Sequence, residues 1–146
     1  MSRRIHLITL GVGDMARSRA FYEAAFGLVP SSASADSTVF YQLDGGVVLT
    51  LYDMKMLRAD LRLGAEAPSR PDFGGITLAQ NQPTRAEVDA VLARALDAGA
   101  RLIAPAAETF WGGYVGYFAD PDGHVWEIAH NPHFALGPDG GLRLPD

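Results

Sequence analysis

The order of local sequence patterns repeats once along the chain, and this repetition constrains the fold more than any other feature. A strand-like run at 5–14 is followed by helical spacing of apolar residues at 15–27 and by two β-type runs at 37–53. The second half shows the same order at 73–80, 84–100 and 114–131. The sequence therefore predicts two similar units, each with a strand, a helix and a strand hairpin, and one extra strand in each unit near Leu28 and Leu102.

Residues that start and stop helices lie where the repeated pattern needs them. Thr84, with Glu87 three positions later, forms a capping-box pattern, and Gly99 is placed to end the same helix. Gly27 is placed to end the first helix. The hairpin turns are expected at 44–46 and 121–123, where Asp, Gly and Pro are concentrated.

The 146 residues are enough for one compact domain with a buried core. We divide it into a first module at about 1–53, a connector at about 54–72, a second module at about 73–131 and a tail at 132–146. Met54, Leu57 and Leu61 give the first part of the connector the spacing of a short helix. The tail has too much Gly and Pro for regular structure, but its apolar residues indicate that it packs on another part of the protein.

Charge and composition exclude several classes of protein. The net charge of −5, with 12 scattered Lys and Arg residues, argues against nucleic-acid binding, which needs a basic surface. The absence of cysteine excludes disulfides, thiol nucleophiles and thiolate metal sites. No run approaches the roughly 20 apolar residues that cross a bilayer, so no membrane partner is expected. The N-terminal run is interpreted as a strand rather than a leader, and the protein is expected in the cytoplasm.

Two segments resemble a known family. The opening VGDMARSRAFYEAAFGL and the close GGYVGYFADPDGHVWEI are similar to the glyoxalase, bleomycin-resistance and ring-cleaving dioxygenase superfamily, also called vicinal oxygen chelate proteins. The likeness covers nearly the whole chain, and the DPDG turn with a carboxylate four residues after its Gly is its most specific element. The resemblance implies an α+β fold of two βαβββ modules whose curved mixed sheets form a cleft. Such a cleft binds small molecules, often with a divalent metal at its base.

The resemblance also implies where a metal would be held. Metal-dependent members draw ligands from one position on each of four strands, and the alignment places these positions at Leu7, Leu49, Gly75 and Glu127. Leucine and glycine side chains cannot coordinate a cation, and one carboxylate does not hold a divalent ion tightly. No metal cofactor is therefore expected.

The four histidines are the alternative source of metal ligands. His6 neighbours the first ligand position, but adjacent residues of a strand face opposite ways, so His6 would need a bulge to reach the cleft. Glu127 and His130 are three residues apart on a strand and also face opposite ways. A divalent-metal glyoxalase or dioxygenase that uses a shifted His6 is therefore the third-ranked function.

Glu127 is the candidate catalytic residue. Strand alternation places it on one face with Val125 and Ala129, while the more apolar Trp126 and Ile128 pack on the helices. This orientation points Glu127 into the cleft.

Two roles are open for this carboxylate. Apolar neighbours such as Leu7, Leu49 and Phe118 would disfavour its charged form, which suits general acid or base catalysis. Alternatively, hydrogen bonds from Tyr or Thr hydroxyls hold Glu127 as a structural charge.

The FWGGY stretch indicates binding more than chemistry. Trp111 and Tyr114 flank the Gly112–Gly113 pair, which permits close approach of the backbone to a ligand. The alternative is that Phe110 and Trp111 belong to the core and the glycines form a bulge. The predicted ligand contacts are Leu7, Leu49, Trp111, Tyr114, Phe118 and Glu127.

These observations favour a metal-independent protein, expected to be homodimeric, that binds an aromatic or amphiphilic small molecule in an aromatic-lined cleft. The second hypothesis is a lyase or isomerase in which Glu127 moves a proton.

Overall fold

The computed structural model describes residues 5–60 and 76–144 of the chain. The first half contains β1 (Leu7–Val12), α1 (Met15–Phe26), β2 (Thr38–Gln42), the 3-10 turn η1 (Asp44–Gly46), β3 (Val48–Asp53) and α2 (Met54–Asp60). The second half contains β4 (Thr77–Asn81), α3 (Arg85–Asp97), β5 (Arg101–Glu108), β6 (Tyr114–Ala119), β7 (Val125–His130), β8 (Ala135–Leu136) and β9 (Leu142–Arg143).

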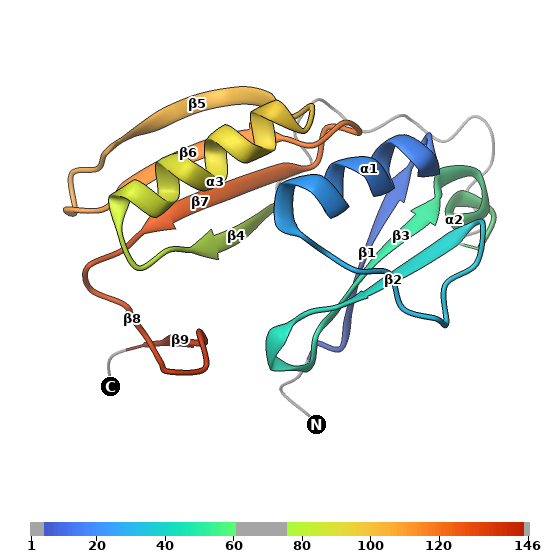
Figure 1. The fold of residues 1–146 in the computed structure, drawn as a ribbon, viewed down its shortest axis with the longest axis horizontal. Helices are drawn as coiled ribbons and strands as arrows, with labels where there is room; N and C mark the ends of the chain where they lie inside the picture. Colours follow the sequence, from blue (N-terminus) through green and yellow to red (C-terminus); the bar gives the residue numbers. More distant parts are fainter. Residues whose placement is uncertain (1–4, 61–75, 145–146) are drawn as a thin grey trace.

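The two main sheets have the same internal arrangement. The first has the order β1-β3-β2 and the second has the order β4-β7-β6-β5. In each, the strand before the helix runs parallel to the last strand of the hairpin, and the hairpin itself is antiparallel. The predicted duplication is therefore confirmed, and the fold is an α+β fold with two mixed sheets (Figure 1).

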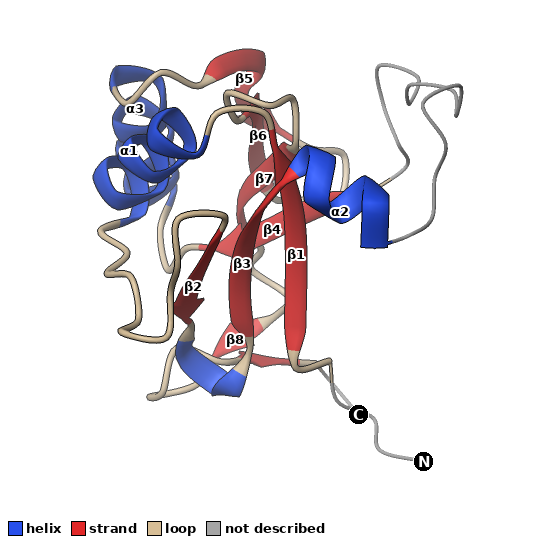
Figure 2. Ribbon diagram, turned by 90° about the vertical axis from the view of Figure 1, so that its right-hand side faces the viewer, coloured by secondary structure: helices blue, strands red, loops and turns tan. Residues whose placement is uncertain are grey.

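The helices divide the molecule into sides. α1 and α3 lie next to each other and cover the same side of the two sheets (Figure 1). α2 lies on the other side of the first sheet (Figure 2). α2 begins at Met54, where the short helix of the connector was predicted. Leu61, which was also assigned to that helix, lies outside the described residues.

The extra strand predicted in each module is present in only one of them. Near Leu102 the chain forms the eight-residue strand β5. Near Leu28 the chain makes only an isolated bridge between Pro30 and Tyr41. Proline has no N–H to donate to a strand ladder, and a turn follows in which the Ser34 amide donates to the Ser31 carbonyl oxygen. Among the residues that the structure describes, the first sheet therefore has one strand fewer than the second.

The local signals set the helix ends as predicted. Thr84 caps α3, because its side-chain oxygen accepts a hydrogen bond from the Glu87 amide at 3.2 Å. The Glu87 carboxylate accepts in turn from the Thr84 hydroxyl at 2.8 Å. Gly27 ends α1 in the left-handed conformation, with φ of 66°.

The core lies between the sheets and the α1–α3 layer. It is rich in aromatic side chains that contact one another at angles, and Phe118 and Trp126 stack with ring centroids 6.4 Å apart. Ile128 is also fully buried there. The prediction that Trp126 and Ile128 pack on the helix side is therefore confirmed.

The DPDG turn connects the second module to the first. Asp122 Oδ1 accepts from the Gly13 amide at 2.9 Å, and its Oδ2 accepts from the Ser18 hydroxyl at 2.7 Å. His124 Nε2 lies 2.9 Å from the Gly11 carbonyl oxygen. The turn thus holds the start of α1 against the second sheet.

The tail contains more regular structure than was predicted. β8 and β9 pair antiparallel around a turn in which the Gly140 amide donates to the Gly137 carbonyl oxygen. The expectation of no regular structure is therefore wrong for 135–143.

Within the described residues, none of the helices has the length and apolar character that would be needed to cross a membrane.

Candidate functional site

Each main sheet has one face against α1 or α3 and a second face turned away from both helices (Figure 2). We call these second faces together the open face. Strand pairing and alternation place on it Leu7, Thr9, Gly11, Thr38, Phe40, Gln42, Val48, Thr50 and Tyr52 of the first sheet, and Thr77, Ala79, Asn81, Val115, Tyr117, Ala119, Val125, Glu127 and Ala129 of the second. α2 covers one end of it, since a Cβ on Gly11 would lie 2.6 Å from Met54 Cε.

Glu127 lies in the middle of the second sheet on the open face. Its neighbours across the strands are Ala79 in β4 and Tyr117 in β6. The Tyr117 hydroxyl donates to Glu127 Oε2 at 2.7 Å, and both side chains are half-buried. A hydrogen bond from a tyrosine to this carboxylate is the contact that a structural role requires, so the structural alternative has direct support.

Tyr117 is held in its neutral form. The hydrogen bond to Glu127 raises the pKa of Tyr117 to about 12, and partial burial and the negative charge of Glu127 act in the same direction. At neutral pH the phenol therefore remains a donor and occupies Oε2 of the carboxylate. Within the described residues Oε1 of Glu127 has no hydrogen-bond partner. The pair thus presents one acceptor oxygen to the open face.

Trp111 is positioned by the glycines that follow it. A Cβ on Gly113 would lie 1.9 Å from Cη2 of Trp111, so the indole ring occupies the space that any other side chain would need. Alternate residues of a strand share a face, so Gly113 lies on the same side as Val115 and Tyr117, which is the open face. The loop is held further by His133, whose Nε2 lies 2.8 Å from the Trp111 carbonyl oxygen.

Three of the side chains predicted to line the cleft with Glu127 lie on the opposite face, so the prediction is wrong for Leu49, Phe118 and Tyr114. Leu49 and Phe118 are buried in the core at 1% and 0% exposure. The Tyr114 hydroxyl donates to Asp89 of α3 at 2.8 Å, and the Arg85 guanidinium lies over its ring. Alternation separates all three from Glu127.

Leu7 does lie on the open face, at the start of β1 and next to Val48. Its side chain is 52% exposed and so is accessible to a ligand or to another protein surface. Leu7, Trp111 and Glu127 are thus the predicted ligand contacts that the fold leaves on the open face, and their roles in binding stay predictions.

The donor set near Glu127 does not fit a divalent metal. The open-face positions beside it in the neighbouring strands are Ala79 and Tyr117, and Leu7 offers no donor. On β3 the open-face positions are Val48 and Thr50 rather than the predicted Leu49, and Gly75 lies outside the described residues. Within 5–60 and 76–144, no three His, Cys, Asp or Glu side chains are grouped as metal ligands.

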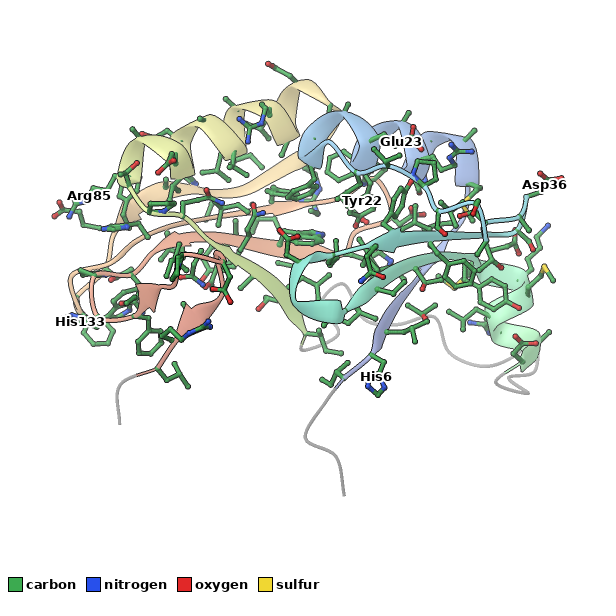
Figure 3. All side chains as sticks on the ribbon, turned by 60° about the horizontal axis from the view of Figure 1, so that its bottom comes forward. His6, Tyr22, Glu23, Asp36, Arg85 and His133 are labelled. Carbon is green, nitrogen blue, oxygen red and sulfur yellow. The ribbon has the colours of Figure 1, made fainter. Side chains whose placement is uncertain are left out.

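The histidines do not converge on Glu127. His6 precedes β1, whose register with β3 runs without a bulge from Leu7 to Val12, and it lies far from His133 (Figure 3). His130 Nδ1 lies 3.1 Å from the Gln82 carbonyl oxygen. The rings of His124 and His133 are likewise each held by a backbone carbonyl oxygen. The bulge that a metal site at His6 would need is not formed.

Sequence reasoning did not single out Tyr117 as a partner of Glu127. The signal was present in the hairpin register, because pairing Ala119 with Val125 across the DPDG turn brings position 117 opposite position 127. Both strands lack charged residues other than Glu127, so a hydroxyl directly opposite it is the nearest polar group on that face.

The fold and the site define a two-module α+β protein whose second sheet presents a tyrosine-bound carboxylate on its open face. Comparison with known proteins gives the family: the chain belongs to the Glyoxalase/Bleomycin resistance protein/Dioxygenase superfamily, whose family model matches residues 4–128.

The similar proteins agree with this assignment. The structure of a glyoxalase-related enzyme from Fulvimarina pelagi superposes with a TM-score of 0.88 at 37% sequence identity, covering 99% of this chain and 100% of that one. A family enzyme from Burkholderia phytofirmans superposes with a TM-score of 0.73 at 21% identity, covering 86% of this chain and 96% of that one, which supports the fold alone. An uncharacterized protein of Mycobacterium tuberculosis H37Rv is 29% identical over 128 residues, which are 84% of this chain and 70% of that protein.

Proposed function

We propose that the protein binds a small organic molecule in a cleft on the open face, with Glu127 as the polar anchor and Trp111 as an aromatic wall, and without a divalent metal. The observation that carries this proposal is the Tyr117–Glu127 pair, which leaves Glu127 Oε1 available on a surface of small and apolar side chains. Membership in the superfamily supports small-molecule binding as the general role.

The surroundings of Glu127 define what the ligand must offer. A carboxylate accepts hydrogen bonds, and Tyr117 already donates to its other oxygen, so the ligand must bring a donor such as an N–H or O–H group. Ala79, which lies beside Glu127 in β4, is small and exposed. It leaves room for an apolar ligand body next to the carboxylate, which is the composition typical of ligand sites.

The test is a fragment screen of the full chain by ligand-observed NMR, using compounds that pair an aromatic body with a hydrogen-bond donor. We expect Glu127→Gln to weaken the hits at least about tenfold, roughly 1.4 kcal/mol, because an amide is a weaker acceptor than a carboxylate. Glu108→Gln is the matched control, since that side chain is 70% exposed at the end of β5. Equal binding by wild type and Glu127→Gln would reject Glu127 as the anchor.

A second candidate function is supported by the same oxygen. A half-buried carboxylate with one unengaged oxygen has the geometry of a general base, so a lyase or isomerase reaction in which Glu127 removes a proton is the alternative. Turnover assays on the compounds that bind separate the two functions. Turnover lost in Glu127→Gln with binding retained would favour the enzyme, whereas binding without turnover in wild type would favour the binder.

We also propose a homodimer in the cytoplasm. Ile5, Leu7 and Ile76 are exposed apolar side chains at the starts of β1 and β4, which are edge strands of their sheets among the described residues. Light scattering on purified protein tests the assembly, and a mass twice the 15.6 kDa of the chain is expected. A mass of one chain at micromolar concentration would reject the dimer.

A further inference from the structure

The two modules differ at the edge next to their helices. In the second module β5 fills this edge: a Cβ on Gly116 would lie 2.6 Å from Leu92 Cδ1 of α3 and 3.0 Å from the Ala106 backbone nitrogen of β5. Helix, central strand and edge strand are therefore in contact, and no room remains between them.

In the first module the corresponding segment forms no strand. Its pairing consists of isolated bridges, Pro30 with Tyr41 and Ala35 with Thr38. The gap between α1, this loop and β2 is a cavity of about 370 Å³. That volume is within the range of small-molecule sites. The cavity lies on the α1 side of the first sheet and is therefore on the opposite side from Glu127.

The floor of the cavity is apolar and its rim carries both charges. Met15 and Ala16 form its accessible apolar lining, whereas Val39 is buried at 2% exposure. Arg19 comes from α1 and Asp36 from the loop. In Figure 3 Asp36 stands at the outer end of the first module. An apolar surface with one cation and one anion at its edge fits a ligand with the complementary pair.

The cation is held in place before any ligand binds. Arg19 Nε donates to Glu23 Oε1 at 2.9 Å, and the Tyr41 hydroxyl donates to the same oxygen at 3.3 Å. This contact uses one of the five N–H donors of the guanidinium and orients the rest of the group. Fixing a long side chain in advance lowers the entropy cost of binding an anion.

The anion and the hydroxyl of the rim are available. Within the described part of the chain Asp36 makes no hydrogen bond or ion pair. Ser34 Oγ accepts from the Phe40 amide at 3.0 Å, which leaves its O–H free to donate to a ligand. The lining thus offers donors at Arg19 and Ser34 and an acceptor at Asp36.

We propose that this cavity is a second binding site, independent of the open face, for a small aliphatic zwitterion. The ligand carboxylate binds Arg19 and Ser34, the ligand ammonium binds Asp36, and the methylene groups lie on Met15 and Ala16. A ligand with a single charge satisfies only one side of the rim, so the site discriminates by the charge pair rather than by size alone.

The test measures amide chemical shifts of the full chain with unbranched ω-amino acids from glycine to 6-aminohexanoate. The series varies the distance between the two charges, and hexylamine and hexanoate each carry one of them. We expect one chain length to bind best in the millimolar range, with shifts at Ser34, Ala35 and Val39, and both single-charge analogues to bind at least about tenfold more weakly. No shifts at these residues with any member, or equal binding of hexylamine, would overturn the proposal.

Variants separate this site from the open face. Asp36→Asn keeps the shape of a side chain that has no partner among the described residues, so folding is retained. Because it removes the negative charge, affinity for the best amino acid is expected to fall at least about tenfold. Asp44→Asn in η1, an exposed carboxylate outside the cavity, is the matched control and should leave affinity unchanged. Unchanged affinity in Asp36→Asn would reject the assignment, and loss of affinity in Glu127→Gln would show that the ligand occupies the open face instead.

Discussion

The Tyr22 hydroxyl of α1 donates to Asp120 Oδ2 at 2.7 Å across a separation of 98 residues, and both side chains are buried. The same hydroxyl accepts from Trp126 Nε1 at 3.2 Å. Burial, followed by the charge of Asp120, raises the pKa of Tyr22 well above its usual value. The phenol therefore stays neutral and links the helix of the first module to the turn and strand of the second. The two segments that carry the family resemblance therefore contact each other here, one from each module.

Tyr22→Phe should destabilise the protein by about 1 to 3 kcal/mol, because it leaves Asp120 Oδ2 and Trp126 Nε1 buried without their partner. Urea unfolding followed by circular dichroism measures the change. Tyr52→Phe is the control, since the Tyr52 hydroxyl bonds to Asp60 at an exposed position. A loss in Tyr22→Phe no larger than in Tyr52→Phe would contradict the role of this link.

Asp122→Ala should also weaken the contact between modules. The change removes acceptors for the Gly13 amide and the Ser18 hydroxyl, and the Asp122 side chain is only 9% exposed. We expect a loss of roughly 2 kcal/mol in the free energy of unfolding. Asp139→Ala breaks an exposed ion pair with Arg143 and should cost less than about 1 kcal/mol. Similar losses in the two variants would argue that the turn is not a structural link.

The sequence was sufficient where the determining signals are local. Thr84 and Gly27 act on backbone groups within a few residues, so the ends of α3 and α1 follow from the chain itself. The orientation of Glu127 followed for a similar reason, because it is the charged residue in a strand whose alternate positions, Trp126 and Ile128, are strongly apolar.

The sequence was insufficient where both faces of a strand are apolar. In β3 the run VLTLYD is apolar at odd and even positions, so the pattern does not say whether Leu49 faces the helices or the open face. Phe118 in YVGYFA has the same ambiguity. Near Leu28 no strand forms, because Pro30 and the turn at Ser31 compete with strand pairing. The outcome of this competition depends on tertiary contacts, so the local sequence did not predict it.

Gly113→Ala should displace the Trp111 ring. The new methyl group would overlap the indole, so we expect a loss of about 1 to 3 kcal/mol in stability and a change in the environment of Trp111. Intrinsic fluorescence, compared between this variant and Trp111→Phe to subtract the signal of Trp126, reports the displacement. Gly13→Ala is the control, because its methyl group would meet its nearest atom at an ordinary 3.6 Å. An unchanged Trp111 signal in Gly113→Ala would contradict the close approach of the Trp111 ring to Gly113.

Tyr117 should ionise near pH 12, because the hydrogen bond to Glu127, partial burial and the Glu127 charge all raise its pKa. A tyrosine in the unfolded chain ionises near pH 10. Since the folded state favours the neutral phenol, the stability from this pair is complete below about pH 10 and is lost as the pH rises through the folded pKa. Ultraviolet absorbance of the phenolate during an alkaline titration measures the ionisation.

Two variants assign this titration. Burial raises the pKa of Tyr41 to about 12 as well, so Tyr117→Phe is needed to identify which part of the high-pH signal belongs to Tyr117. Glu127→Gln removes the charge and the strongest acceptor, and should move the Tyr117 ionisation back toward pH 10. An ionisation that stays near pH 12 in Glu127→Gln would mean that burial, and not the pair with Glu127, holds the phenol neutral.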